Sequence, residues 1–109
     1  MRTSVWISYD LGVSGDYEGV YAWLDEHKAK ECVGNVAFVS YEWEGDDFVA
    51  SLKQDLEASL KVTKRTRLYA IWRDQKTNKL RGRFVFGGRR APQWAGYGAV
   101  EEQAEVDES

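Results

Sequence analysis

Apolar and polar residues alternate at a period of two along several short stretches, which is the pattern of strands with one buried face. Residues 3–11 (TSVWISYDL) show it first, with Val5, Ile7 and Tyr9 on one side. Stretches rich in β-branched and aromatic residues predict further strands at 30–33, 36–43, 67–73 and 79–86. A Gly34-Asn35 turn joins the second to the third, and the polar loop 74–78 joins the last two.

Two other stretches repeat their apolar residues every three to four positions, which predicts amphipathic helices. The first is capped by Ser14 or Asp16 and ends near residues 27–29. Its stripe is formed by Tyr17, Val20, Tyr21 and Leu24. The second helix covers 48–60 and begins after an acidic loop that supplies its cap. Its stripe is formed by Phe48, Val49, Leu52, Leu56 and Leu60.

This order of elements predicts an α+β fold, βαββαβ with an additional C-terminal strand. Each helix has a single apolar stripe, so both helices should cover one face of a shared sheet and leave the other face open. We expect a ferredoxin-like two-layer sandwich in one domain, residues 1–98, with an irregular arm at 87–98 and a disordered acidic tail at 99–109. In the last strand, alternation places Gly82, Phe84 and Phe86 toward the helices. It places the following residues on the open face: Trp6, Ser8, Asp10, Arg67, Tyr69, Ile71, Arg73, Arg81 and Arg83.

Composition narrows the function classes. Hydrophobic residues make up 43% of the 109 residues, with a single proline, as in a globular chain. One cysteine and one histidine exclude an internal disulfide and a cysteine-clustered zinc site. Nucleotide-binding glycine motifs and the serine-hydrolase motif are absent. There is no long apolar run and no secretory signal, so we expect a cytoplasmic protein without membrane contact.

Charge is strongly partitioned along the chain. Residues 61–90 hold 11 Lys and Arg against 1 acidic residue, whereas residues 1–60 and 91–109 are net acidic. Aromatic residues interrupt the basic block, and arginine and aromatic side chains together favour phosphate and base binding. The candidate binding residues for nucleic acid or a partner are Arg67, Tyr69, Arg73, Arg81, Arg83, Arg89, Arg90 and Trp94. The alternative is a solvated hairpin that pairs with the acidic segments of the chain.

Several segments resemble a known family: ISYDL (7–11), GVSGDY (12–17), YEGVYAWLDEH (17–27), VAFVSYE (36–42) and RLYAIW (67–72). They resemble the small ferredoxin-like proteins that include the CRISPR adaptation subunit of Cas type two, the SinR-like proteins and virulence-associated protein D. The resemblance covers residues 3–86, and its motif is the aspartate that closes the first strand, Asp10. The chain departs from the family in its short second strand, in the loop after Asp10 and in the basic segment after residue 86.

The resemblance implies a homodimer formed through the sheet and metal-dependent endonuclease activity from paired strand-end aspartates. Asp10 is then the candidate catalytic residue, and Asp10 and Asp16 are candidate ligands of Mg²⁺. In the simpler interpretation, Asp10 caps a turn and Asp16 caps a helix.

Two function classes follow. The first is a small nucleic-acid-binding homodimer with nuclease activity as a further expectation; arginine and aromatic content do not distinguish DNA from RNA. The alternative is a non-catalytic protein-interaction or inhibitor module, regulatory or phage-encoded, that docks through an exposed strand and the arm at 87–98. In that segment, Trp94 either binds a partner or packs on its own domain or a dimer mate.

Overall fold

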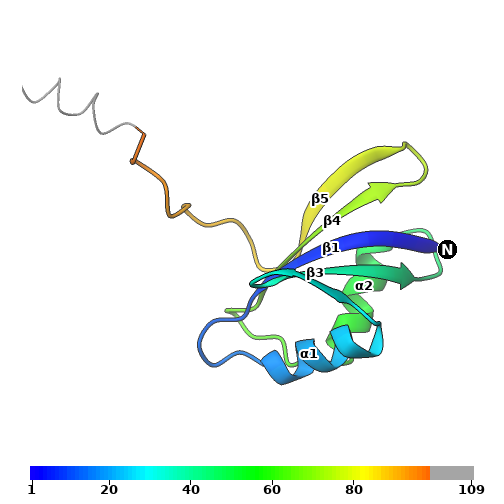
Figure 1. Cartoon of the computed structure of the whole chain (residues 1–109), viewed down its shortest axis with the longest axis horizontal. Coiled ribbons are helices and arrows are strands. Elements are labelled where there is room, and N and C mark those ends of the chain that lie inside the picture. Colours follow the sequence, from blue (N-terminus) through cyan, green and yellow to red (C-terminus); the bar gives the residue numbers. More distant parts are fainter. Residues whose placement is uncertain (99–109) are drawn as a thin grey trace, which may run out of the picture.

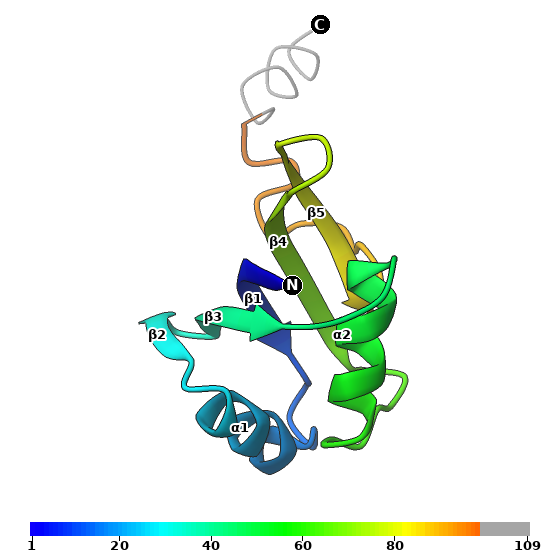
Figure 2. The same cartoon turned by 90° about the vertical axis from the view of Figure 1, so that its right-hand side faces the viewer.

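One antiparallel sheet organises the chain, and two helices lie against one of its faces (Figures 1 and 2). The computed structural model describes residues 1–98. Its elements are β1 (Arg2–Asp10), α1 (Tyr17–Glu26), β2 (Lys30–Val33), β3 (Val36–Glu42), α2 (Phe48–Glu57), β4 (Arg67–Asp74) and β5 (Lys79–Phe86). The strand order is β2-β3-β1-β4-β5. The predicted α+β class and element order are confirmed, in an arrangement compatible with a two-layer sandwich.

The central strands follow the predicted alternation. Along β1, Val5, Ile7 and Tyr9 are buried toward the helices, and the residues between them are exposed. In β4, Leu68, Ala70 and Trp72 are buried in the same way. Residues 2–8 of β1 pair with β3 on one side, and residues 5–10 pair with β4 on the other. Because cross-strand partners share a face, the buried side chains of the three strands form one continuous apolar layer.

The helices complete this core. The buried residues of α2 are Phe48, Leu52 and Leu56, as its stripe predicted, although the helix ends at Glu57 rather than at residue 60. In α1 the buried residues are Val20 and Trp23, whereas Tyr21 is 52% exposed. The predicted stripe of α1 was therefore rotated by part of a turn. The bulky Trp23 side chain, which donates its indole N–H to Asp55 of α2, defines the buried face instead.

The strand β5 differs from the prediction. A β-bulge lies where Leu68 pairs with Phe86 but the next residue, Tyr69, pairs with Phe84. Val85 is the extra residue, and both Val85 and Phe86 are buried. The bulge shifts the alternation by one residue, so the open face receives Leu80, Gly82 and Phe84. The expectation that Arg81 and Arg83 lie on the open face was wrong: they pair with Trp72 and Ala70, on the helix-covered side.

The arm after β5 is irregular, as predicted, but within the described chain Trp94 does not pack on its own domain. Residues 87–98 form bends and turns, and Trp94 and Tyr97 are 74% and 76% exposed. Figure 1 shows this segment leading away from the sheet. The predicted acidic tail, 99–109, lies outside the described residues. Within residues 1–98, no helix is long and apolar enough to cross a membrane.

Candidate nucleic-acid interface

Two aromatic rings and two guanidinium groups meet on the open face of the sheet. Tyr69 of β4 and Phe84 of β5 are direct cross-strand partners, and their ring centroids lie 4.8 Å apart at an edge-to-face angle of 75°. The guanidinium carbons of Arg67 and Arg89 each lie 5.7 Å from the centre of the Phe84 ring. We call these four residues the Phe84 platform. A ring flanked by two cations combines a stacking surface with two phosphate-binding groups.

Two glycines shape the platform. A Cβ at position 82 would overlap the Tyr69 hydroxyl and approach its ring to 3.0 Å, so Gly82 leaves the space in which that ring lies. Gly87 has a φ of +72°, and a Cβ there would lie 2.7 Å from the backbone oxygen of Thr66. The chain therefore turns at Gly87 as only glycine readily does. Directly after the turn, the carbonyl of Gly88 accepts a hydrogen bond of 3.2 Å from Arg67 Nε, which fixes the base of the arm beside the platform.

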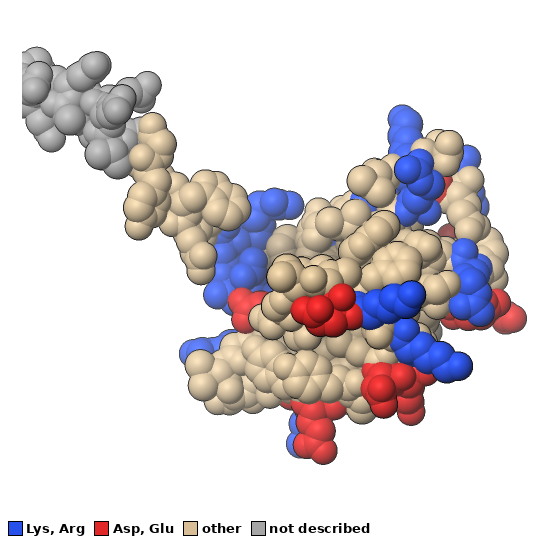
Figure 3. All heavy atoms as spheres, viewed as in Figure 1, with Lys and Arg blue, Asp and Glu red and all other residues tan. Residues whose placement is uncertain are grey.

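Asp10 borders the platform. Its carboxylate lies 3.6 Å from Arg67 Nη1 and accepts a 3.2 Å hydrogen bond from the backbone N–H of Gly12. Ser8, Asp10 and the platform line a hollow of about 380 Å³. Figure 3 shows Lys and Arg side chains gathered at the base of the arm, next to a small acidic group. The hollow therefore has a cationic rim that is partly neutralised by one carboxylate.

Further apolar side chains extend across the open face. Trp6 and Phe38 are cross-strand partners with ring centroids 5.0 Å apart, and Ile71 pairs with Trp6 from the other side. Trp6 and Ile71 are 41% and 37% exposed. The open face thus has an apolar strip over its centre, with the Phe84 platform on β4 and β5.

The structure brings together some of the residues that the sequence singled out and separates others. Arg67, Tyr69 and Arg89 form the platform, with Asp10 beside it. Arg73 lies on the open face but nearer the hairpin turn, where Nη1 donates to the carbonyl of Asn78. Arg90 and Trp94 are exposed on the arm. Arg81 and Arg83 lie on the other side of the sheet. Phe84, the centre of the platform, was expected in the core, because nothing in the local sequence marks the bulge that turns it outward.

The residues expected to bind Mg²⁺, Asp10 and Asp16, offer few free oxygen ligands. Asp16 accepts backbone hydrogen bonds of 2.9 Å through both oxygens, from Gly19 at the start of α1 and from Lys61 after α2. These bonds lower the pKa of Asp16 and give it the capping role. Asp10 already faces the charge of Arg67. Residues 1–98 contain no cluster of three or more His, Cys, Asp or Glu side chains suited to a metal ion. The donors of one described chain do not fit Mg²⁺, and paired aspartates in a dimer remain a prediction.

No family model, curated protein or solved structure matches the chain, so its function is inferred from these side chains.

Proposed function

We propose that this protein binds single-stranded nucleic acid on the open face of its sheet, stacking a base on the Phe84 platform. The observation that carries the proposal is the half-buried Phe84 ring, with Tyr69 in edge-to-face contact and two guanidinium carbons 5.7 Å from its centre. Bases stack on such exposed rings, and arginines bind the adjoining phosphates. In a duplex the bases are stacked on one another, so we expect the single strand to be preferred.

The arrangement of elements supports a ferredoxin-like sandwich as the frame for this interface. Along the chain, α1 connects β1 to β2 and α2 connects β3 to β4, and these four strands lie in the order β2-β3-β1-β4. Strand β5 is an addition at the edge of β4. It is this addition that supplies Phe84. A platform of this composition consequently depends on the extra strand and on the arm that follows it.

We also propose the homodimer, with the apolar strip as its interface. Support comes from the exposure of Trp6 and Ile71, two large apolar side chains that are cross-strand partners in the middle of the face. Sedimentation of the full chain should give about twice the 12.5 kDa mass of one chain. The change Trp6→Ser should return the mass to that of a monomer. A wild-type monomer at micromolar protein would contradict the dimer but not the binding of nucleic acid by one chain.

The test of nucleic-acid binding is fluorescence anisotropy with labelled single- and double-stranded oligonucleotides of DNA and RNA. Phe84→Leu keeps an apolar side chain but removes the ring, and stacking is worth about 1–3 kcal/mol per base, so Kd should rise roughly 5- to 150-fold. Tyr21→Leu is the matched control, because Tyr21 is an exposed ring on α1. Unchanged affinity in Phe84→Leu would contradict stacking on the platform.

A pair of double variants tests the two faces of the hairpin. Arg67→Ala with Arg89→Ala removes both platform cations, whereas Arg81→Ala with Arg83→Ala removes two cations from the other face. Kd is measured between about 50 and 200 mM salt, and log Kd is plotted against the logarithm of the salt concentration. Relative to the wild type, the slope should be lower by about 1.4 for the first pair, because each single-strand phosphate contact contributes about 0.7. A larger loss in the second pair would place the nucleic acid on the other side of the sheet.

The protein-interaction module is the second candidate, and one observation favours it. Trp94 and Tyr97 are exposed on the same short turn of the arm, where Tyr97 N–H donates to the carbonyl of Trp94 at 3.1 Å. Two exposed aromatic residues on one short turn are typical anchors for a protein partner. Absence of salt-sensitive oligonucleotide binding by the wild type would favour this candidate over the first.

A further inference from the structure

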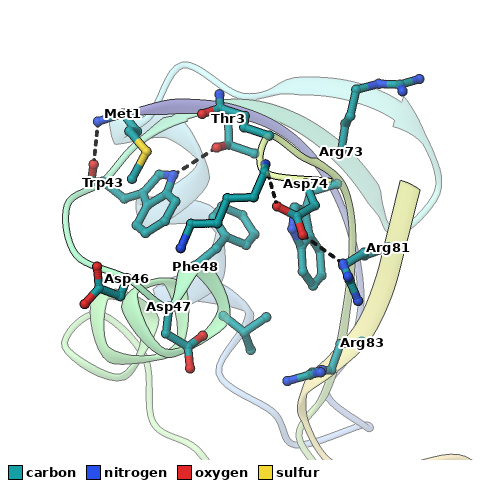
Figure 4. A pocket seen from close by; sticks show the side chains of 14 residues that line it. Met1, Thr3, Trp43, Asp46, Asp47, Phe48, Arg73, Asp74, Arg81 and Arg83 are labelled. Atoms are coloured by element: carbon teal, nitrogen blue, oxygen red, sulfur yellow. Dashed lines mark hydrogen bonds and ion pairs between the residues drawn. The ribbon is translucent and has the colours of Figure 1, made fainter. Parts of the chain in front are cut away.

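A second cavity lies on the helix-covered side of the β4–β5 hairpin, between the hairpin and the start of α2 (Figure 4). Its volume is about 290 Å³. None of the four platform residues lines it. We call it the hairpin cleft. Because it faces away from the open side of the sheet, an inference about it does not depend on the proposed function.

The floor of the hairpin cleft is aromatic. Phe48 lies between two tryptophans, with ring centroids 5.5 Å from Trp43 and 4.9 Å from Trp72. Trp43 donates its indole N–H to Thr3 Oγ1 at 2.9 Å, so its polar edge is satisfied. Phe48 and Trp72 are each 7% exposed. The floor is thus apolar, with the Phe48 ring inclined by 74° to the Trp43 ring and by 36° to the Trp72 ring.

The two sides of the cleft carry opposite charge. Asp46 and Asp47 lie on one side, in the loop before α2, and Arg81 and Arg83 project from β5 on the other (Figure 4). Arg81 is engaged by Asp74, with Nε donating to Oδ2 at 3.0 Å, and Asp47 caps α2 by accepting from Ala50 N–H. Asp46 and Arg83 make no ion pair within the described part of the chain. Asp46 and Arg83 therefore remain exposed charges of opposite sign, and the exposed Lys76 adds a further cation to the lining.

We propose that the hairpin cleft binds a free α-amino acid with a large apolar side chain. The Arg83 guanidinium binds its carboxylate, the Asp46 carboxylate binds its ammonium group, and its side chain packs on the ring of Phe48 and the neighbouring indoles. The three aspartates of the lining disfavour a polyanion, and its arginines and Lys76 disfavour a simple cation. A cavity at the lower end of the usual range for small-molecule sites suits a ligand of about a dozen non-hydrogen atoms, such as phenylalanine. A ligand of this size in an open cleft should have a Kd in the roughly 0.1–2 mM range.

The test compares three probes that differ by one charged group. L-phenylalanine carries both groups, phenethylamine lacks the carboxylate, and 3-phenylpropionate lacks the ammonium group. Amide chemical shifts of the full chain, titrated with each probe, should show L-phenylalanine binding at least about tenfold more tightly than either analogue, since a charge-assisted hydrogen bond of about 1.5 kcal/mol corresponds to that factor. The shifted amides should include those of Trp43, Phe48 and Trp72.

Two charge-removing variants assign the groups. Arg83→Gln should abolish the difference between L-phenylalanine and phenethylamine, and Asp46→Asn the difference between L-phenylalanine and 3-phenylpropionate. Both residues are exposed, so the fold should be retained. Arg65→Gln and Asp25→Asn are matched controls at exposed positions outside the cleft. Equal binding of L-phenylalanine and 3-phenylpropionate, an unchanged preference in either variant, or no saturable shift at several millimolar ligand would overturn the proposal.

Discussion

Neutralising Asp10 should strengthen the binding of nucleic acid to the Phe84 platform. In the folded chain the Asp10 carboxylate lies 3.6 Å from Arg67 Nη1, one of the two cations beside the Phe84 ring. It therefore competes with phosphate for Arg67 and repels any phosphate that binds there. The change Asp10→Asn removes this charge but keeps an oxygen that can accept from the backbone N–H of Gly12, so the turn after β1 should be retained.

The size of the effect follows from the geometry. A phosphate on the far side of the Arg67 guanidinium would lie about 7 Å from the Asp10 charge, and two unit charges at that separation repel by about 0.6 kcal/mol in water. The Asp10 side chain is 52% exposed, so water-like screening is appropriate. The gain corresponds to about a threefold lower Kd at low salt. It should shrink as the Debye length falls toward 8 Å at physiological ionic strength.

Anisotropy titrations of wild type and Asp10→Asn with the same single-stranded oligonucleotide measure this gain. Asp25→Asn is the control for net charge, because Asp25 is exposed on α1, which covers the other face of the sheet. Weaker or unchanged binding in Asp10→Asn, or an equal gain in Asp25→Asn, would refute the electrostatic reasoning. Repeating the titrations with Mg²⁺ tests the nuclease expectation as well: if the wild type cleaves the oligonucleotide and Asp10→Asn cleaves it equally, Asp10 is not catalytic.

Two further predictions concern stability. Burial, together with the neighbouring Asp55 carboxylate, raises the pKa of Tyr41 to about 12, above the value of about 10 in an unfolded chain. Above about pH 10 the folded state keeps this proton and the unfolded state loses it. The stability that the group contributes below about pH 10 should therefore be lost as the pH rises toward 12, and less of it in Tyr41→Phe. If urea unfolding shows the same loss of stability with pH in both proteins, this reasoning is contradicted. Gly87→Ala should destabilise the fold by about 1–3 kcal/mol in thermal unfolding, because the added Cβ meets the Thr66 carbonyl in a left-handed backbone conformation. Gly88→Ala, where a Cβ meets no atom within 4 Å, is the control, and equal losses in the two variants would show that the Gly87 contact is unimportant.

Much of the fold could be predicted because the central strands obey simple geometry. Strands β1 and β4 pair regularly, so side chains at every second position share a face, and Val5, Ile7 and Leu68 are buried as their spacing indicates. Helix α2 was equally clear, since its apolar residues recur at helical spacing. Helix α1 was harder, because its aromatic residues lie on more than one side. There the choice between Trp23 and Tyr21 depends on which can reach β3 and α2, and that is a property of packing rather than of periodicity.

The arrangement of the candidate site was less predictable, although its basic and aromatic composition was evident. One extra residue at the Val85 bulge moves Phe84 out of the core and moves Arg81 and Arg83 to the opposite side of the sheet. The basic block of 61–90 therefore does not act as a single patch. Arg67 and Arg89 flank a ring on the open face, where a polyanion has access, whereas Arg83 faces the acidic loop before α2 across the hairpin cleft. The same hairpin thus places arginines on two surfaces with different neighbours. Changes to the two sets of arginines should therefore affect the binding of different ligands. A count of charges along the sequence cannot reveal this separation.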